Sequence, residues 1–196
     1  EIQLGRSRTV RRAYGIDEIA LVPGGRTVDP AVTDSSWSLG GITREIPIIA
    51  SAMDSVVDVR MAVELTRQGA LGVLNLEGVQ CRYDDPNPVL DRIAAVGKEA
   101  FVPLMQELYS QPVRADLIRR RIAEIREQGG IAAVSATPVA ALKFGSTIAE
   151  AGADLLVVQA TVVSTEHSGP EGQESLDLER LCRDFGVPVV IGNCVT

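Results

Sequence analysis

Residues 129–138, GGIAAVSATP, contain the structural unit from which most of this chain is built. Gly129 ends an amphipathic, charge-rich pattern over residues 115–128, as a helix C-cap does. Residues 131–134 form a short apolar run of the kind found in strands that are buried on both faces. A second helical pattern follows over residues 139–151. Helix, glycine, strand and helix in this order indicate βα units around a parallel sheet.

The same pattern of helix, glycine and strand recurs on both the N-terminal and the C-terminal side of this segment. Apolar, β-branched runs predict strands at residues 46–50, 70–74, 131–134, 155–158 and 187–191. Helices are predicted at residues 58–68, 115–128, 139–151 and 176–185, with Gly69, Gly129, Gly152 and Gly186 as their C-caps. The last strand has no helix after it, and a complete barrel needs about 250 residues. We therefore predict an α/β fold, a parallel (β/α)8 TIM-type barrel of which the first four to five βα units are present. An open, doubly wound five-stranded sheet is the alternative.

Two segments depart from this pattern. Residues 1–45 are expected to form a lead-in that covers one end of the sheet, with a short strand at 19–22 and an irregular piece at 37–41. Residues 76–114 are rich in Pro and Asp, and only 88–96 are expected to be helical. We interpret them as an insertion that could act as a lid. The whole chain, residues 1–196, is then the N-terminal part of a single barrel domain.

Composition excludes several classes of function. The chain has 45% apolar residues and a net charge of −7, so it lacks the clustered basic residues needed for nonspecific nucleic-acid binding. No apolar run approaches the roughly 20 residues of a membrane helix, and no secretory signal is evident, so we expect a cytoplasmic protein without membrane contact.

The chemistry-bearing residues narrow the choice further. Three cysteines without a C-x-x-C pair are expected to be reduced thiols, and His167 is the only histidine, which excludes a metal site built on several histidines. There is no dinucleotide fingerprint and no P-loop. Lys143 falls inside a helical pattern, which disfavours a Schiff base. Cys194 follows the fifth strand, but only His167 could serve as its base.

Short polar side chains follow every predicted strand, where the loops of a parallel sheet converge. The segments are 51–55, 75–77, 135–138, 159–161 and 193–196. They suit hydrogen bonding to a polar heterocycle or a sugar better than hydrolysis by paired carboxylates. Simpler interpretations stay open: Ser51 and Ser55 as helix N-caps, Met53 as core filling, and Asn193 as a turn residue.

Several of these segments together resemble the inosine-5′-monophosphate (IMP) dehydrogenase and guanosine-5′-monophosphate (GMP) reductase superfamily. The resemblance rests on residues 14–23 (YGIDEIALVP), 46–56 (IPIIASAMDSV), 69–74 (GALGVL), 130–134 (GIAAV), 151–154 (AGAD) and 189–196 (VVIGNCVT). The chain is most similar to the bacterial, dehydrogenase-related branch that lacks CBS domains.

The resemblance implies roles for particular residues. Ser51, Met53 and Asn193 are expected to contact the substrate nucleotide. The loop after the third strand and the end of the fourth strand are expected to face the nicotinamide cofactor, through Ala136, Thr137, Gln159, Ala160 and Thr161. Gln159 stands where the family usually has an aspartate.

The implied activity is NAD-dependent oxidation of IMP to xanthosine monophosphate (XMP) in guanine nucleotide synthesis, through a cysteine thioimidate. The catalytic cysteine loop is expected beyond Thr196, so none of these residues is assigned as catalytic and the 196-residue chain is predicted to be inactive. The resemblance also implies a homotetramer and a monovalent cation such as potassium. The alternatives are a GMP reductase that uses NADPH and a non-catalytic, nucleotide-binding half-barrel.

Overall fold

The computed structural model describes residues 2–4, 8–163, 181–183 and 185–194. The chain forms two compact units, Glu1–Asp34 and Ser35–Thr196. The first contains an antiparallel pair, β1 (Ile2–Leu4) and β2 (Arg8–Val10), and two short 3-10 turns, η1 (Ile16–Glu18) and η2 (Pro30–Val32). The strand predicted at residues 19–22 is wrong. Leu21 and Val22 are almost fully exposed and pair with no strand, so the apolar run has nothing to pack against.

The second unit opens with a hairpin of β3 (Trp37–Leu39) and β4 (Ile42–Arg44). Gly40 and Gly41 connect the strands and have φ angles of +56° and +84°. Positive φ at both central residues is what a tight hairpin turn with the twist of its strands requires. The irregular piece predicted for residues 37–41 is therefore a regular hairpin.

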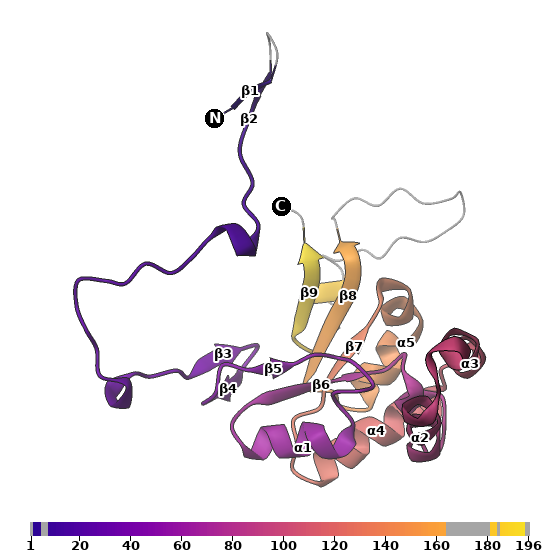
Figure 1. The fold of residues 1–196 in the computed structure, drawn as a ribbon. Helices are drawn as coiled ribbons and strands as arrows, with labels where there is room; N and C mark the ends of the chain where they lie inside the picture. Colours follow the sequence, from indigo (N-terminus) through magenta and orange to yellow (C-terminus); the bar gives the residue numbers. More distant parts are fainter. Residues whose placement is uncertain (1, 5–7, 164–180, 184, 195–196) are drawn as a thin grey trace. The chain divides into compact units, whose positions relative to one another are not determined.

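A five-stranded parallel sheet forms the body of this unit, and its strands follow one another in chain order. They are β5 (Ile49–Ala50), β6 (Leu71–Asn75), β7 (Ala133–Ala136), β8 (Leu155–Val163) and β9 (Val189–Cys194). The sheet curls rather than lying flat (Figure 1). Sequential order without reversal, together with this curl, confirms the predicted partial TIM-type barrel and excludes the doubly wound alternative.

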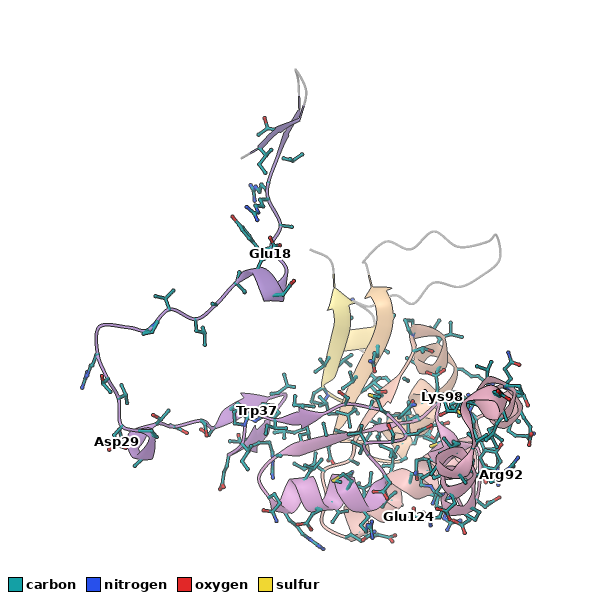
Figure 2. The ribbon with its side chains drawn as sticks, in the orientation of Figure 1. Glu18, Asp29, Trp37, Arg92, Lys98 and Glu124 are labelled. Carbon is teal, nitrogen blue, oxygen red and sulfur yellow. The ribbon has the colours of Figure 1, made fainter. Side chains whose placement is uncertain are left out.

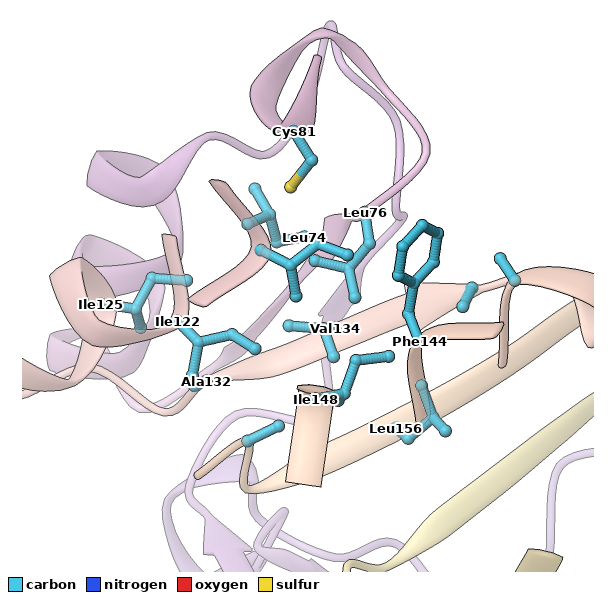
Figure 3. Close-up of a cluster of buried hydrophobic side chains, with 14 of the residues drawn as sticks. Leu74, Leu76, Cys81, Ile122, Ile125, Ala132, Val134, Phe144, Ile148 and Leu156 are labelled. Carbon is cyan, nitrogen blue, oxygen red and sulfur yellow. The ribbon is translucent and has the colours of Figure 1, made fainter. Parts of the chain in front are cut away.

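Among the elements for which the structure gives bounds, three helices pack on the outer face of the sheet: α1 (Val59–Arg67), α4 (Ala115–Glu127) and α5 (Pro138–Glu150). Figure 3 shows the cluster that joins the layers, with Leu74, Val134 and Leu156 from the strands facing Ile122 and Ile148 from the helices. All five side chains are fully buried. Alternate strand residues point outward in this way, so the outer layer is carried by apolar burial.

The inner face has a separate cluster around Leu71, Val73, Ala133 and Leu155. Among the described residues, no helix contributes to it; the hairpin does, through Trp37, Leu39 and Ile42. Because these strand residues lie toward the amino ends of their strands, the hairpin covers that end. The carboxyl ends of the strands lie at the opposite end of the sheet, where the loops of a parallel sheet converge.

The predicted helix ends agree with the structure. Gly69 and Gly129, with φ of +84° and +77°, follow α1 and α4 in the left-handed conformation of a C-cap glycine. At the other end of α1, the Asp58 carboxylate accepts from the Met61 amide at 2.6 Å. Asp58 is thus the N-cap, and the interpretation of Ser51 and Ser55 as caps is wrong. The helix predicted at residues 176–185 lies largely outside the described residues.

The insertion contains η3 (Val79–Cys81), α2 (Asn87–Ala95) and α3 (Lys98–Ser110). The helix predicted at 88–96 is confirmed as α2, but α3 was not expected, because Pro103 lies inside it and proline normally ends a helix. Arg92 of α2 and Glu107 of α3 form a 3.1 Å ion pair across the two helices; Figure 2 labels Arg92 on α2. Because this segment contains both α2 and α3, the expectation of a single helix is wrong.

Within the described residues, no helix combines the length and the apolar character needed to span a bilayer.

Candidate functional site

Polar residues gather at the carboxyl edge of the curled sheet, as the strand register shows. Asn75 at the end of β6 pairs with Ser135 of β7, and Gln159 of β8 pairs with Gly192 of β9. Ser51 follows directly after β5, which pairs with β6. The edge therefore brings together segments that are more than a hundred residues apart in sequence.

The β5–α1 loop presents two of the predicted nucleotide-binding residues. Ser51 is exposed, and Met53 is 52% exposed, so the interpretation of Met53 as core filling is wrong. Met53 donates its amide to the Ser51 carbonyl at 2.8 Å, and its own carbonyl accepts from the amides of Val56 and Val57 at 2.9 and 3.0 Å. Val57 is fully buried and anchors the turn in the core. The loop thus holds Ser51 and Met53 outward on a compact turn.

Asp54, the next residue, contacts the insertion. Its Oδ2 atom accepts a 3.0 Å hydrogen bond from the Val79 amide and a second from the Tyr109 hydroxyl. Its Oδ1 atom is buried and has no hydrogen-bond partner among the described residues. Burial, and next the hydrogen bond to Asp54, raise the pKa of Tyr109, so its phenol stays protonated and able to donate.

Glu77 connects the end of β6 to the β7–α5 loop. Its two carboxylate oxygens accept from the Thr137 amide at 2.6 Å and from the Thr137 hydroxyl at 3.1 Å. The same hydroxyl caps α5 by accepting from the Ala140 amide at 3.3 Å. Thr137 is exposed, whereas Ala136 is only 2% exposed and packs in the outer core. Their predicted contacts with a cofactor stay predictions.

The remaining predicted positions lie on β8 and β9. Gln159 is exposed and Ala160 is half-buried. Thr161 lies in β8 and Asn193 in β9, but their side chains lie outside the described part, as does His167 altogether. Ser51, Met53, Thr137 and Gln159 are therefore the predicted site residues that the structure places, exposed, at this edge.

The described cysteine side chains are free thiols. Cys81 is fully buried, and burial raises its pKa to about 12, while Cys182 is exposed. Neither of these two cysteines is in a disulfide in the structure, and the expectation of reduced thiols stays a prediction. A buried thiol with such a pKa is protonated at neutral pH, so Cys81 is no candidate nucleophile.

Sequence reasoning missed Tyr109 and the pairing of Glu77 with Thr137. Asp54 and Tyr109 are 55 residues apart, and Tyr109 lies on the unexpected helix α3. The one available signal was that Asp54 and Glu77 are the acidic residues closest after their strands.

A family model described as the IMP dehydrogenase / GMP reductase domain matches residues 13–196. The chain belongs to this family. An uncharacterized oxidoreductase of Mycolicibacterium smegmatis is 35% identical over 97% of the chain and 52% of its own length. An uncharacterized oxidoreductase of Mycobacterium tuberculosis strain H37Rv is 37% identical with the same coverage.

Further comparisons agree with the family. The IMP dehydrogenase of Methanocaldococcus jannaschii is 43% identical over 65 residues, which are 33% of this chain and 13% of that protein. The crystal structure of an IMP dehydrogenase/GMP reductase-like protein from Corynebacterium glutamicum superposes with a TM-score of 0.86 at 30% identity, covering 98% of this chain and 51% of that one. The chain thus spans about half the length of the relatives that it matches.

Proposed function

We propose that the full-length protein oxidises IMP to XMP with NAD⁺ as the hydride acceptor. The observation that carries this proposal is the β5–α1 loop, which presents Ser51 and Met53 at the carboxyl edge of a curled parallel sheet in a chain of this family. A serine hydroxyl can hydrogen-bond a purine nucleotide, and a polarizable methionine can pack against its base. Asn193, on the last described strand, is proposed to contribute from the other side.

The neighbouring strand ends fit a nicotinamide cofactor in chemistry. Gln159 offers an exposed amide with both donor and acceptor atoms, which suits a carboxamide, and Thr137 is exposed beside it in the strand order. Ala136, Ala160 and Thr161 complete the proposed surface. NAD⁺ would supply the hydride acceptor, while these residues bind and orient it. We propose that the nucleophilic cysteine lies in the rest of the full-length protein, which corresponds to the part of the relatives that this chain does not match.

GMP reduction with NADPH is the second candidate, because the matching family includes both activities. It would use the same nucleotide loop. A nucleotide-binding protein without catalysis is the third. Cytoplasmic location, a homotetramer and a monovalent cation such as potassium remain part of the proposal.

The test uses the full-length protein from its natural source. We expect NADH to form when IMP and NAD⁺ are added together. NADPH consumption with GMP, without NADH formation from IMP, would favour the reductase. Binding of IMP without either reaction would favour a nucleotide-binding protein, and absence of IMP and GMP binding would contradict all three.

Ser51→Ala, with Ser55→Ala as its control, tests the nucleotide loop. Both serines are exposed and lie in the same loop. Loss of one hydrogen bond to the nucleotide is expected to raise the KM for IMP by about tenfold in Ser51→Ala. Ser55→Ala is expected to keep the wild-type KM. Equal effects of the two substitutions would argue against a specific role for Ser51.

A further inference from the structure

The insertion is bonded directly to the loop that carries the proposed nucleotide-binding residues. Asp54 immediately follows Met53, and its carboxylate accepts from the Val79 amide of η3 and from the Tyr109 hydroxyl of α3. Both donors belong to the insertion, and the acceptor belongs to the β5–α1 loop. One carboxylate thus joins two segments that are separate in the chain.

Tyr109 is held in place independently of Asp54. It packs in the apolar cluster of the insertion, formed around Val79, Val89 and Leu108. The Arg82 guanidinium lies 5.4 Å from the centre of its ring, and Arg82 is itself oriented by a 2.9 Å hydrogen bond to the Glu77 carbonyl. A tyrosine packed in this way presents its hydroxyl from a defined position.

The opposite side of the Asp54 carboxylate is closed by Gly78. A Cβ atom added at Gly78 would collide with Asp54 Oδ1. The backbone φ at Gly78 is −87°, a value that any residue adopts, so a larger residue here would act through space, by displacing the Asp54 carboxylate, and not through conformation. The Asp54 carboxylate is therefore enclosed by Gly78, the Val79 amide and the Tyr109 hydroxyl.

We propose that Asp54 and Tyr109 are positioning residues of the nucleotide site, through which the helical insertion sets the place of Ser51 and Met53. This inference rests on the proposed function, since it assigns a role within the same site. The other hydrogen bonds of the turn, from Met53 to Ser51 and from Val56 and Val57 to Met53, lie within the loop and do not tie it to the insertion. The Asp54 carboxylate provides that tie.

The chain offers a closely matched pair of variants, Tyr109→Phe and Tyr83→Phe. Both tyrosines are half-buried and pack in the same cluster of the insertion. The Tyr109 hydroxyl donates to Asp54, whereas the Tyr83 hydroxyl donates to the Leu108 carbonyl at 2.9 Å, within the insertion. Each substitution removes one hydroxyl, but only Tyr109→Phe removes a hydrogen bond between the insertion and the β5–α1 loop, where the bond from the Val79 amide remains.

The experiment uses the full-length protein and two main readouts, IMP binding by calorimetry and amide hydrogen exchange without ligand, with the KM for NAD⁺ as a control. Tyr109→Phe is expected to weaken IMP binding by about tenfold and to leave the KM for NAD⁺ near its wild-type value. The amides of residues 53–57 are expected to exchange faster in this variant. Tyr83→Phe is expected to match the wild type in both readouts, although it also loses a hydrogen bond.

The outcomes separate this inference from the proposed function. Wild-type IMP binding that is unchanged in Tyr109→Phe, or weakened equally in both variants, would overturn the positioning role and leave the proposed function standing. Unchanged exchange of residues 53–57 in Tyr109→Phe would also overturn it. A wild-type protein that does not bind IMP would overturn the proposed function, and this inference with it.

Discussion

The layers of the βα scaffold are joined by apolar packing, whereas the insertion is attached to the scaffold by polar contacts as well. The scaffold is joined across one large apolar cluster, in which fully buried side chains from β6, β7 and β8 meet those of α4 and α5. The insertion has a smaller cluster of its own around Val79, Val89 and Leu108, and it also places Leu76 and Cys81 in the large cluster. Its attachment to the scaffold also uses polar groups, Asp54 on the β5–α1 loop and Arg121 on α4.

Arg121 shows how such an attachment works. Its side chain is 5% exposed, and its guanidinium donates to the carbonyls of Gln80 at 2.9 Å, Tyr83 at 3.2 Å and Asp84 at 2.8 Å. Glu124 pairs with it at 2.8 Å. Apolar contacts are non-directional and tolerate exchange of similar side chains, whereas these bonds each need one particular donor. The insertion should therefore respond to single polar substitutions that the scaffold would survive.

The largest expected effect comes from removing scaffold packing. Leu74→Ala leaves a cavity among fully buried neighbours and is expected to lower the free energy of unfolding of the full-length protein by about 3–4 kcal/mol, measured by urea denaturation. Leu108→Ala, in the small cluster, is expected to cost about 2 kcal/mol and to speed hydrogen exchange mainly in the insertion. Equal global destabilisation by the two would remove the distinction between the regions.

An intermediate effect is expected from Arg121→Met. It removes the Arg121 donor from three carbonyls and leaves Glu124 with Arg120 alone, and it should cost about 2–3 kcal/mol, with the loss of hydrogen-exchange protection concentrated in the insertion. Arg120→Met is the control: Arg120 pairs with the same Glu124 at 2.8 Å, but its side chain is 54% exposed. It should cost less than about 0.5 kcal/mol. If the two variants were equally stable, the attachment would not depend on Arg121.

The smallest effect concerns pH. Burial raises the pKa of Glu124, but hydrogen bonds from Arg121 and Arg120 outweigh it and hold the pKa below its ordinary value of 4.5. A carboxylate with a lowered native pKa stabilises the fold above its unfolded pKa and loses that contribution as the pH falls through the native value. The stability difference between wild type and Glu124→Gln, below about 1 kcal/mol at pH 7, should therefore shrink below about pH 4.5. A pH-independent difference in urea unfolding would show that charge is not involved.

The repeating elements were predictable because each carries its signal locally. The apolar run at residues 131–134 and Gly129 before it identified β7 and the end of α4, although the strand lies two residues later, at Ala133–Ala136. Helix α3 was hidden by Pro103, since its stability comes from packing on the insertion cluster and not from its own propensity. The hairpin β3–β4 was not predictable because its strands are short.

For the candidate site, the residues that follow each strand were identifiable, and Ser51, Met53, Thr137 and Gln159 do lie exposed at one edge. The contacts that hold these residues in place were not identifiable from the sequence. Nothing near Asp54 indicates that its partner is Tyr109, and nothing near Glu77 indicates that both of its oxygens bind Thr137.

Local patterns of polarity were thus enough to establish the parallel βα architecture, because the periodicity of a strand or a helix is visible in the polarity of neighbouring residues. The family resemblance followed from short segments in the same order. Which carboxylate meets which hydroxyl depended on how the insertion packs against the sheet. Such contacts join residues that are distant in the chain, and their partners become defined when the intervening apolar clusters have folded.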